Sequence, residues 1–200
     1  MENRVKALDP RGKRTRQLLQ QVFTELLKEK SMQAITVQDI AQRAKVNRAT
    51  FYDHFEDKYA ILDTCILEGF QRLVASRLSP SSSLNEHTLR LLILTLLEYL
   101  AMMHTECKPS DKQVEPRFET TVQKALYHLL LNWLKKLPPS ALHRRVPLET
   151  LASTISWAIF GAGIQWDYEG QTCSPQEMTD HILTVMSDGL FQIIRVHTQE

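Results

Sequence analysis

Apolar residues recur at helical spacing along almost the whole of this 200-residue chain. Between residues 11 and 30, for example, Leu18, Val22 and Leu26 follow one another one helical turn apart. This pattern is typical of an amphipathic helix, because about 3.6 residues complete one turn. No run alternates between apolar and polar residues as a half-buried strand would over more than a few residues. The sequence therefore predicts an all-α protein.

Capping residues, prolines and glycines predict where the helices begin and end. The predicted helices span residues 11–30, 37–44, 47–54, 58–78, 84–105, 118–137, 148–168 and 175–196. Ser79, Pro80 and the serines that follow them end the fourth helix. This helix would lead out of a small N-terminal domain into a larger helical one.

The charge of the chain is unevenly distributed. Residues 1–58 hold 12 Lys and Arg against 8 Asp and Glu, whereas residues 59–200 hold 12 against 15. The N-terminal part, with a net charge of +4 against −3 for the rest, is therefore the better candidate for a polyanionic partner. The start of the chain is polar and basic, and its most apolar run, residues 91–103, falls well short of the ~20 residues of a membrane span. We expect a cytoplasmic protein.

Two short helices joined by a tight turn are predicted between residues 36 and 54. Thr36 and Asp39 have the spacing of a capping box at the start of the first helix. Asn47 is a good N-cap for the second helix. On that helix Phe51 and Phe55 share a stripe that should face a small core, which leaves the opposite side exposed. This is the layout of a helix-turn-helix, whose second helix enters the major groove of DNA.

The exposed side of the second helix offers groups that recognise DNA. Arg48 has the two donors that pair with guanine, and the methyl groups of Ala49 and Thr50 suit thymine. Tyr52 and His54 are predicted to contact phosphates, and so is Lys58 at the start of the next helix. The candidate DNA-binding residues are Thr36, Lys45, Asn47, Arg48, Ala49, Thr50, Tyr52, His54 and Lys58.

Residues 36-TVQDIAQRAKVNRATFYDHFEDKYAIL-62 resemble the signature of the TetR/AcrR-type bacterial transcriptional regulators. The matching positions are Ile40, Ala41, Ala44, Val46, Thr50, Tyr52, His54, Phe55 and Lys58. Lys45 stands where these families usually have glycine, so it is expected to adopt a left-handed conformation or to alter the turn. Asn47 replaces the more usual serine, and both residues cap a helix well.

The resemblance implies a domain organisation and a mechanism. Residues 1–10 would be a flexible basic arm, 11–57 the three-helix DNA-binding domain, and 58–200 a helical ligand-binding and dimerisation domain with a connecting helix at 58–78. Two such chains would form a homodimer that reads a palindromic operator. A ligand in the C-terminal domain would change the separation of the two reading heads, so that the protein acts as a ligand-responsive repressor.

The C-terminal half holds candidates for the dimer interface and for the ligand site. Residues 148–168 carry more large apolar side chains than one buried stripe needs, and residues 175–196 are similar. The candidate interface residues are Ile155, Ala158, Ile159, Ala162, Ile182, Met186, Leu190 and Ile193. The candidate ligand-binding residues, which favour an apolar or planar organic molecule, are Met103, His104, Cys107, Phe118, Tyr127, Trp133, Trp157 and Trp166.

The sequence gives weaker support for metal binding, thiol redox sensing and enzyme activity. His104 and Cys107 have the spacing of two metal ligands, but no third ligand is near them, and we expect neither a metal nor a cofactor. Cys107 is also a candidate for a thiol redox sensor. No motif of a common enzyme class occurs, so a binding protein is expected rather than an enzyme. A helical protein that binds DNA and a protein partner without a small ligand remains an alternative, and the sequence does not distinguish a repressor from an activator.

Overall fold

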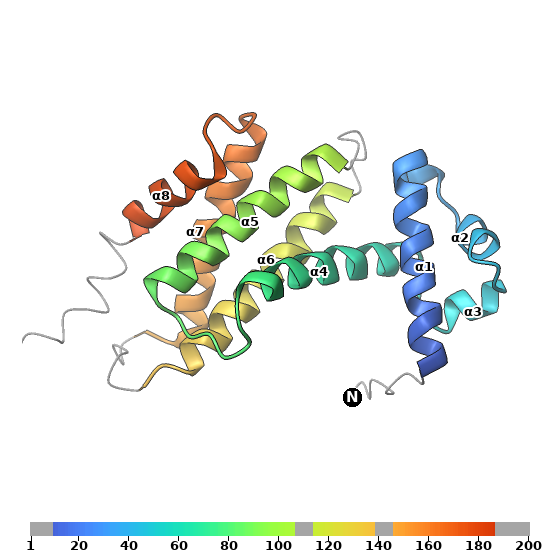
Figure 1. Cartoon of the computed structure of the whole chain (residues 1–200), viewed down its shortest axis with the longest axis horizontal. Helices are drawn as coiled ribbons and strands as arrows, with labels where there is room; N and C mark the ends of the chain where they lie inside the picture. The colour runs from blue at the N-terminus through green and yellow to red at the C-terminus, as the bar shows by residue number, and fades with distance from the viewer. Residues whose placement is uncertain (1–9, 107–113, 139–145, 187–200) are drawn as a thin grey trace, which may run out of the picture. The chain divides into compact units, whose positions relative to one another are not determined.

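The computed structural model describes residues 10–106, 114–138 and 146–186, and helices account for nearly all of them (Figure 1). The N-terminal helices are α1 (Pro10–Glu29), a 3-10 turn η1 (Met32–Ala34), α2 (Val37–Arg43) and α3 (Arg48–Tyr52). The longer helices are α4 (Lys58–Arg77), α5 (Glu86–Glu106), α6 (Val114–Lys135), α7 (Leu148–Tyr168) and α8 (Pro175–Met186). The described residues contain no strand, which confirms the all-α prediction.

Two predicted helix boundaries, the start of α6 and the end of α8, are not reproduced in the described residues. Helix α6 begins at Val114 rather than at Phe118, with Pro116 in its first turn. Proline is tolerated there because the first amides of a helix have no partner within it. Helix α8 is described as far as Met186, so the predicted continuation to residue 196 lies outside the described residues, and so do Leu190 and Ile193.

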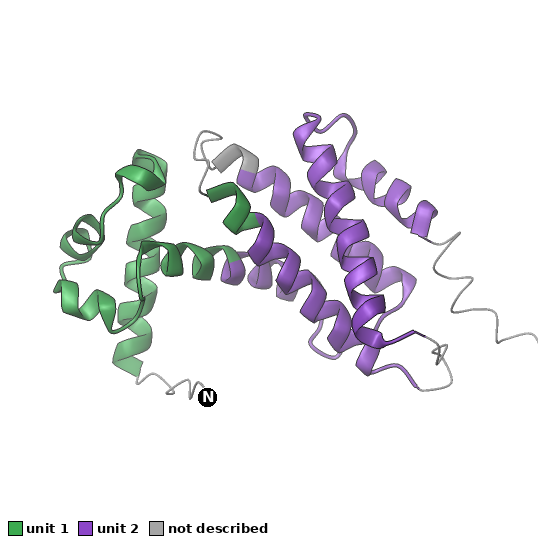
Figure 2. Cartoon of the chain, turned by 180° about the vertical axis from the view of Figure 1, so that it is seen from behind, with its two compact units in different colours: residues 1–66, 107–118 green, residues 67–106, 119–200 purple. Residues whose placement is uncertain are grey.

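The chain divides into two compact units (Figure 2). One comprises residues 1–66 and 107–118, and the other comprises residues 67–106 and 119–200. The division falls within α4, whereas the sequence places the domain boundary at the start of that helix, between residues 57 and 58. The first turns of α4 belong to the N-terminal unit because Ile61 and Leu62 are fully buried there.

The core of the first unit is built from one stripe of each helix. Helix α1 packs against α2, and α2 packs against α3. The buried side chains are Leu19, Val22, Phe23, Leu26, Ile40, Ala41, Phe51, Phe55 and Ile61. Phe51 and Phe55 are only 0% and 4% exposed, which confirms that both face the core.

Helix α5 forms the centre of the second unit and packs against α7 and α8. It is apolar almost all round, and Leu89, Leu92, Ile93, Leu96 and Leu97 have no exposed surface. Such a helix must be covered on several sides. None of the helices in the described residues is both long and apolar enough to cross a membrane.

Glycines allow two close helix contacts in this unit. A Cβ atom at Gly163 of α7 would lie 3.1 Å from a methyl group of Leu100 of α5. A Cβ at Gly69 of α4 would lie 2.9 Å from the hydroxyl of Tyr99, whose ring is buried against Phe70. At these two positions the absence of a side chain lets the neighbouring helix approach.

Candidate nucleic-acid interface

Helix α2 is held at its N-terminus by a complete capping box. The Thr36 hydroxyl accepts a hydrogen bond from the Asp39 amide at 3.1 Å, and the Asp39 carboxylate accepts one from the Thr36 amide at 2.8 Å. Lys30 also donates to this carboxylate at 2.8 Å. The Lys30 ammonium and the Thr36 donors lower the pKa of Asp39 to about 2. The predicted capping box is confirmed, and it fixes the start of α2.

The turn between α2 and α3 depends on one residue with a left-handed backbone. Lys45 has φ of 54°, which lies in the left-handed region that the sequence led us to expect at this position. Its amide donates to the carbonyl of Gln42 at 3.1 Å, and the Val46 amide donates to that of Ala41 at 3.0 Å. These bonds compensate for a strain of about 1–2 kcal/mol that a side chain meets in this conformation. The turn is therefore kept, and it leaves the Lys45 side chain exposed.

Helix α3 presents a continuous exposed edge. Asn47 caps the helix by accepting from the Ala49 amide at 3.1 Å. Arg48 and Ala49 are exposed, Thr50 is half-buried, and Tyr52 is 50% exposed. The structure therefore brings five predicted DNA-binding residues, together with Lys45, onto one short surface. We call residues 45, 47–50 and 52 the reading surface.

Arg16 fastens the end of α3 to α1, a role that the sequence analysis missed. Its guanidinium donates to the carbonyl of His54 at 2.9 Å and to the hydroxyl of Thr64 at 3.3 Å. It also lies 4.4 Å from the centre of the Phe55 ring. The partners are 38 to 48 residues away along the chain, so no local pattern could have identified them.

Lys58 has a different role from the predicted phosphate contact. Its ammonium donates to the carbonyl oxygens of Met32 at 2.9 Å, Gln33 at 3.2 Å and Ile35 at 2.9 Å. An ammonium has three donors, and all three are used inside the domain. Lys58 thus joins the start of α4 to the turn η1, a structural role that the sequence did not predict, and its predicted DNA contact stays a prediction.

Thr36 and His54 also have contacts within the domain. The Thr36 hydroxyl both accepts from and donates to Asp39, so its main contribution is to cap α2. The His54 side chain is half-buried, and its Nδ1 atom is buried with no hydrogen-bond partner among the described residues. Only the other edge of the ring is left to meet a phosphate. The predicted DNA contacts of both residues stay predictions.

Tyr59 packs against a cation from a distant part of the chain. The Arg117 guanidinium lies 4.6 Å from the centre of its ring and donates to the Asp63 carboxylate at 2.9 Å. Arg117 lies near the start of α6, in the part of that helix that belongs to the first unit. It joins this part of α6 to α4. The ring of Tyr59 therefore packs against Arg117 within the first unit.

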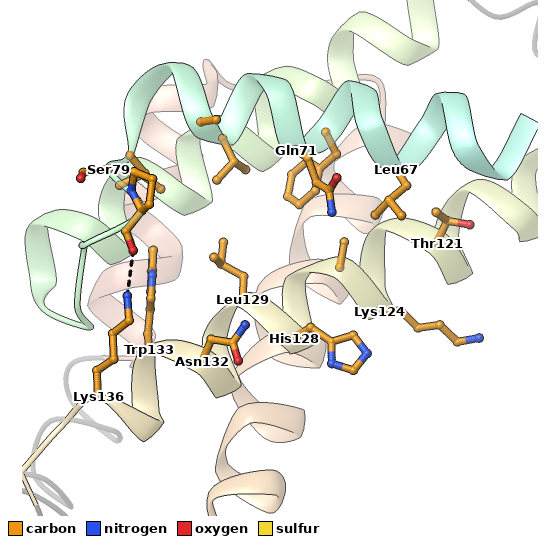
Figure 3. Close-up of a pocket in the computed structure, with 16 residues that line it drawn as sticks. Leu67, Gln71, Ser79, Thr121, Lys124, His128, Leu129, Asn132, Trp133 and Lys136 are labelled. Atoms are coloured by element: carbon orange, nitrogen blue, oxygen red, sulfur yellow. Dashed lines mark hydrogen bonds between the residues drawn. The ribbon is translucent and has the colours of Figure 1, made fainter. Parts of the chain in front are cut away.

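The ligand-binding candidates do not gather at one place. One cavity of about 780 Å³ lies in the second unit between α4, the residues that follow it, and α6 (Figure 3). Of the candidates whose side chains the structure describes, only Trp133 lines it. Trp157 is 57% exposed, and Trp166 is buried with its indole N–H donating to the Cys173 carbonyl, so neither belongs to this cavity.

The five other ligand candidates give no support to a common site. Met103, Phe118 and Tyr127 are half-buried and do not line the cavity. The side chain of His104 and the whole of Cys107 lie outside the described residues. No group of three His, Cys, Asp or Glu residues in the described part of the chain could hold a metal ion.

Four of the six predicted interface residues that the structure describes are core residues. Ile155, Ile159, Ile182 and Met186 are buried within the single chain, so they cannot form the surface of a dimer contact. Ile155 and Ile159 share a stripe with Gly163, which faces α5. Ala158 is exposed and Ala162 is half-buried.

A different set of large apolar side chains is exposed on the same two helices. Trp157 and Tyr168 of α7 are 57% and 55% exposed, and Val185 of α8 is 77% exposed. Trp157 and Tyr168 lie three helical turns apart on one side of α7, with Gly161 between them. We call these residues, with Ala158, the exposed apolar set.

Comparison with known proteins finds a match to one family of regulators in the N-terminal part of the chain. Residues 24–65, which include α2, the turn and α3, match the family model described as bacterial regulatory proteins, tetR family. The chain is 40% identical over 86 residues to YxbF of Bacillus subtilis, an uncharacterized HTH-type transcriptional regulator. It is 25% identical over 122 residues to DhaS of Lactococcus lactis, an HTH-type transcriptional activator of the dhaKLM operon.

These matches cover only parts of the relatives. The first spans 42% of this chain and 22% of YxbF, and the second spans 61% of this chain and 64% of DhaS. Among solved structures, FadR of Bacillus subtilis in complex with stearoyl-CoA has a TM-score of 0.54 at 16% identity. That likeness covers 87% of this chain and 98% of FadR, and it shows a common fold.

Proposed function

We propose that this chain, a member of the TetR family of bacterial regulatory proteins, is a transcriptional regulator that binds operator DNA as a homodimer and responds to a small effector. The observation that carries the proposal is the reading surface. A capped α2, a turn at Lys45 and a capped α3 together expose Arg48, Ala49 and Tyr52. A helix presented in this way fits the major groove, where base edges can be distinguished.

The chemistry of the reading surface supports a division of roles. Arg48 at the first position of α3 would donate two hydrogen bonds to a guanine, and Ala49 and Thr50 would contact thymine methyl groups. Lys45 and Tyr52 would contact phosphates on either side. The excess of positive charge in residues 1–58 would add attraction that does not depend on the DNA sequence.

A symmetric dimer would use the exposed apolar set. Trp157, Tyr168 and Val185 lie on α7 and α8, the two helices for which the sequence predicted an interface. These three residues were not among the predicted interface residues. An aromatic and aliphatic surface of this kind loses contact with water when two copies associate. Two-fold symmetry of the dimer would then match a palindromic operator.

An effector site in the second unit is supported by the cavity between α4 and α6. Its volume of about 780 Å³ is within the usual range for small-molecule sites. FadR of Bacillus subtilis, which has the same fold, was solved with stearoyl-CoA. The alternative, a DNA-binding interaction protein without a small ligand, is less favoured because such a protein has no need of a cavity.

The proposal includes two further points. The protein acts by binding in the cytoplasm and not as an enzyme. Its effect on transcription, repression or activation, depends on where the operator lies relative to the promoter. DhaS is an activator, so a reporter assay rather than family membership must decide this point.

Selection from a library of random DNA duplexes tests the proposal. We expect the wild-type protein to enrich one palindromic sequence, with two half-sites about one helical turn or a multiple of it apart. Sedimentation at micromolar concentration should show a dimer in the same buffer. Enrichment of no sequence would refute DNA recognition, and enrichment of a single half-site by a monomer would refute the homodimer.

A further inference from the structure

The cavity between α4 and α6 has an apolar wall on each side. Leu67, Phe70 and Val74 line it from α4, and Leu129 and Trp133 line it from α6. Figure 3 shows Leu67 and Gln71 pointing from α4 toward the space that Leu129 enters from α6. Ser79 and Pro80, which follow α4, line one end. An apolar molecule placed here would be covered on two sides by hydrocarbon.

The ionisable side chains of the described lining are all bases. Lys124, His128 and Lys136 line the cavity from α6, and none of its described lining residues is Asp or Glu. Burial of a ligand's negative charge is costly unless a positive group is near it. The absence of carboxylates from the lining also removes any repulsion of an anion. Charge complementarity therefore favours an anionic ligand over a neutral or cationic one.

The two lysines are placed differently. Lys136 donates to the carbonyl oxygens of Pro80 at 2.8 Å and Ser82 at 3.2 Å, which holds the residues after α4 against the end of α6. Lys124 is exposed and has no hydrogen bond or ion pair with any described residue. Figure 3 shows Lys124 at the opposite end of the lining from Lys136. Of the two lysines in the described lining, Lys124 is thus the one that is free to pair with a ligand.

We propose that the cavity binds an apolar organic anion, with its hydrocarbon part between α4 and α6 and its negative group at Lys124. The inference rests on the proposed function and names the chemical class of its effector. A carboxylate is the simplest such group. His128, one turn along α6 from Lys124, lies on the same edge of the cavity and adds a second donor.

The test is direct calorimetric titration of the protein without DNA, with decanoate and 1-decanol as probes. The two share a hydrocarbon chain and differ in charge. We expect decanoate to bind more tightly at low salt, and its advantage to shrink as salt rises, because exposed charges are screened. Equal affinities at low salt would overturn the assignment of an anionic ligand.

Three variants locate the site. Lys124→Glu should weaken decanoate binding about tenfold and leave decanol binding unchanged, since an exposed pair is replaced by a repulsion. Lys135→Glu, the same charge change on an exposed residue of α6 outside the lining, should alter both affinities less than about twofold. Ala125→Trp should fill the cavity and abolish binding of both probes.

The outcomes separate this inference from the proposed function. Equal effects of Lys124→Glu and Lys135→Glu would refute the pairing with Lys124, and unchanged binding to a folded Ala125→Trp variant would refute the cavity as the site. Circular dichroism shows whether each variant is folded. If Ala125→Trp does not fold, the comparison of Lys124→Glu with Lys135→Glu still decides the assignment. A protein that binds decanoate at this site but selects no DNA sequence would contradict the proposed function and not this site.

Discussion

The ammonium of Lys58 lies 2.9 Å from the carbonyl oxygen of Met32, and it makes two further hydrogen bonds to the carbonyls of Gln33 and Ile35. A single lysine thereby joins the connecting helix α4 to the turn that precedes α2. The orientation of the reading surface depends on this junction, because α2 begins two residues after Ile35.

Lys58→Met should therefore act on stability. We expect the free energy of unfolding to fall by about 1–3 kcal/mol, since three carbonyl groups, two of them in part-buried contacts, lose a charged donor. The dependence of DNA affinity on salt should keep its slope, whereas loss of a phosphate contact would lower that slope by about one unit. Urea unfolding and binding at several salt concentrations measure the two effects. Lys45→Met, which removes an exposed lysine of the reading surface, is the matched control. It should leave the free energy of unfolding unchanged and lower the slope of the salt dependence by about one unit.

Asp39→Asn should weaken the start of α2 in a pH-dependent way. The folded protein holds the pKa of Asp39 at about 2, below its ordinary value of 3.8. A lowered carboxyl pKa stabilises the fold above the ordinary value, and the effect is lost as pH falls through the lowered one. The free energy of unfolding of the variant should be about 1 kcal/mol lower than that of the wild type at pH 7.

Urea unfolding at pH 7, 4, 3 and 2 checks this, and the difference from wild type should shrink toward pH 2. Asp53→Asn, which removes one exposed carboxylate at the end of α3, controls for the change in net charge. Its free energy of unfolding should stay within about 0.5 kcal/mol of wild type at pH 7. A constant difference for Asp39→Asn at all four pH values would exclude the capping role.

Trp157→Glu should separate the two copies of the dimer. A charge within the exposed apolar set would have to be buried on association, which is unfavourable without a partner. Analytical ultracentrifugation should show a monomer at micromolar concentration, with the helical content unchanged. Met102→Glu, at an exposed apolar residue of α5, is the control and should remain dimeric. A dimeric Trp157→Glu protein would place the interface elsewhere.

Arg48→Ala should relax sequence specificity at one base pair. An arginine that donates twice to guanine contributes about 1–3 kcal/mol to the choice of that base. Repeating the duplex selection with the variant should give the same consensus with one position degenerate in each half-site. A uniform loss of affinity for all sequences would instead make Arg48 a phosphate contact.

Local signals made much of the fold predictable. The box at Thr36, the cap at Asn47 and the stripe of Phe51 and Phe55 involve residues at most four positions apart, and each is confirmed. Such contacts can be recognised in sequence because the helix itself brings the residues together. The same reasoning gave nearly all helix boundaries to within a few residues.

Contacts between distant segments could not be predicted. Lys58 looked like a phosphate ligand because its partners at residues 32–35 belong to a turn with no sequence signature. Helix α7 has apolar residues on more than one side, and only the position of α5 decides which side is core. Ile155 and Ile159 were therefore assigned to the interface, while the exposed Trp157 was assigned to the ligand site. An aromatic residue type does not indicate whether its side chain faces a cavity, the core or solvent.

The most direct test of the central claim is the affinity of the wild-type protein and of Ala49→Glu for the selected duplex and for a shuffled duplex. A glutamate in the first turn of α3 is compatible with the helix, since negative charge is favourable there, but it would repel DNA. We predict that the wild type binds the selected duplex at least about 10³-fold more tightly than the shuffled one at the same salt concentration. The folded variant should lose this preference. Equal affinity of the wild type for both duplexes, or an unchanged preference in Ala49→Glu, would contradict the assignment of α3 as the DNA-reading helix.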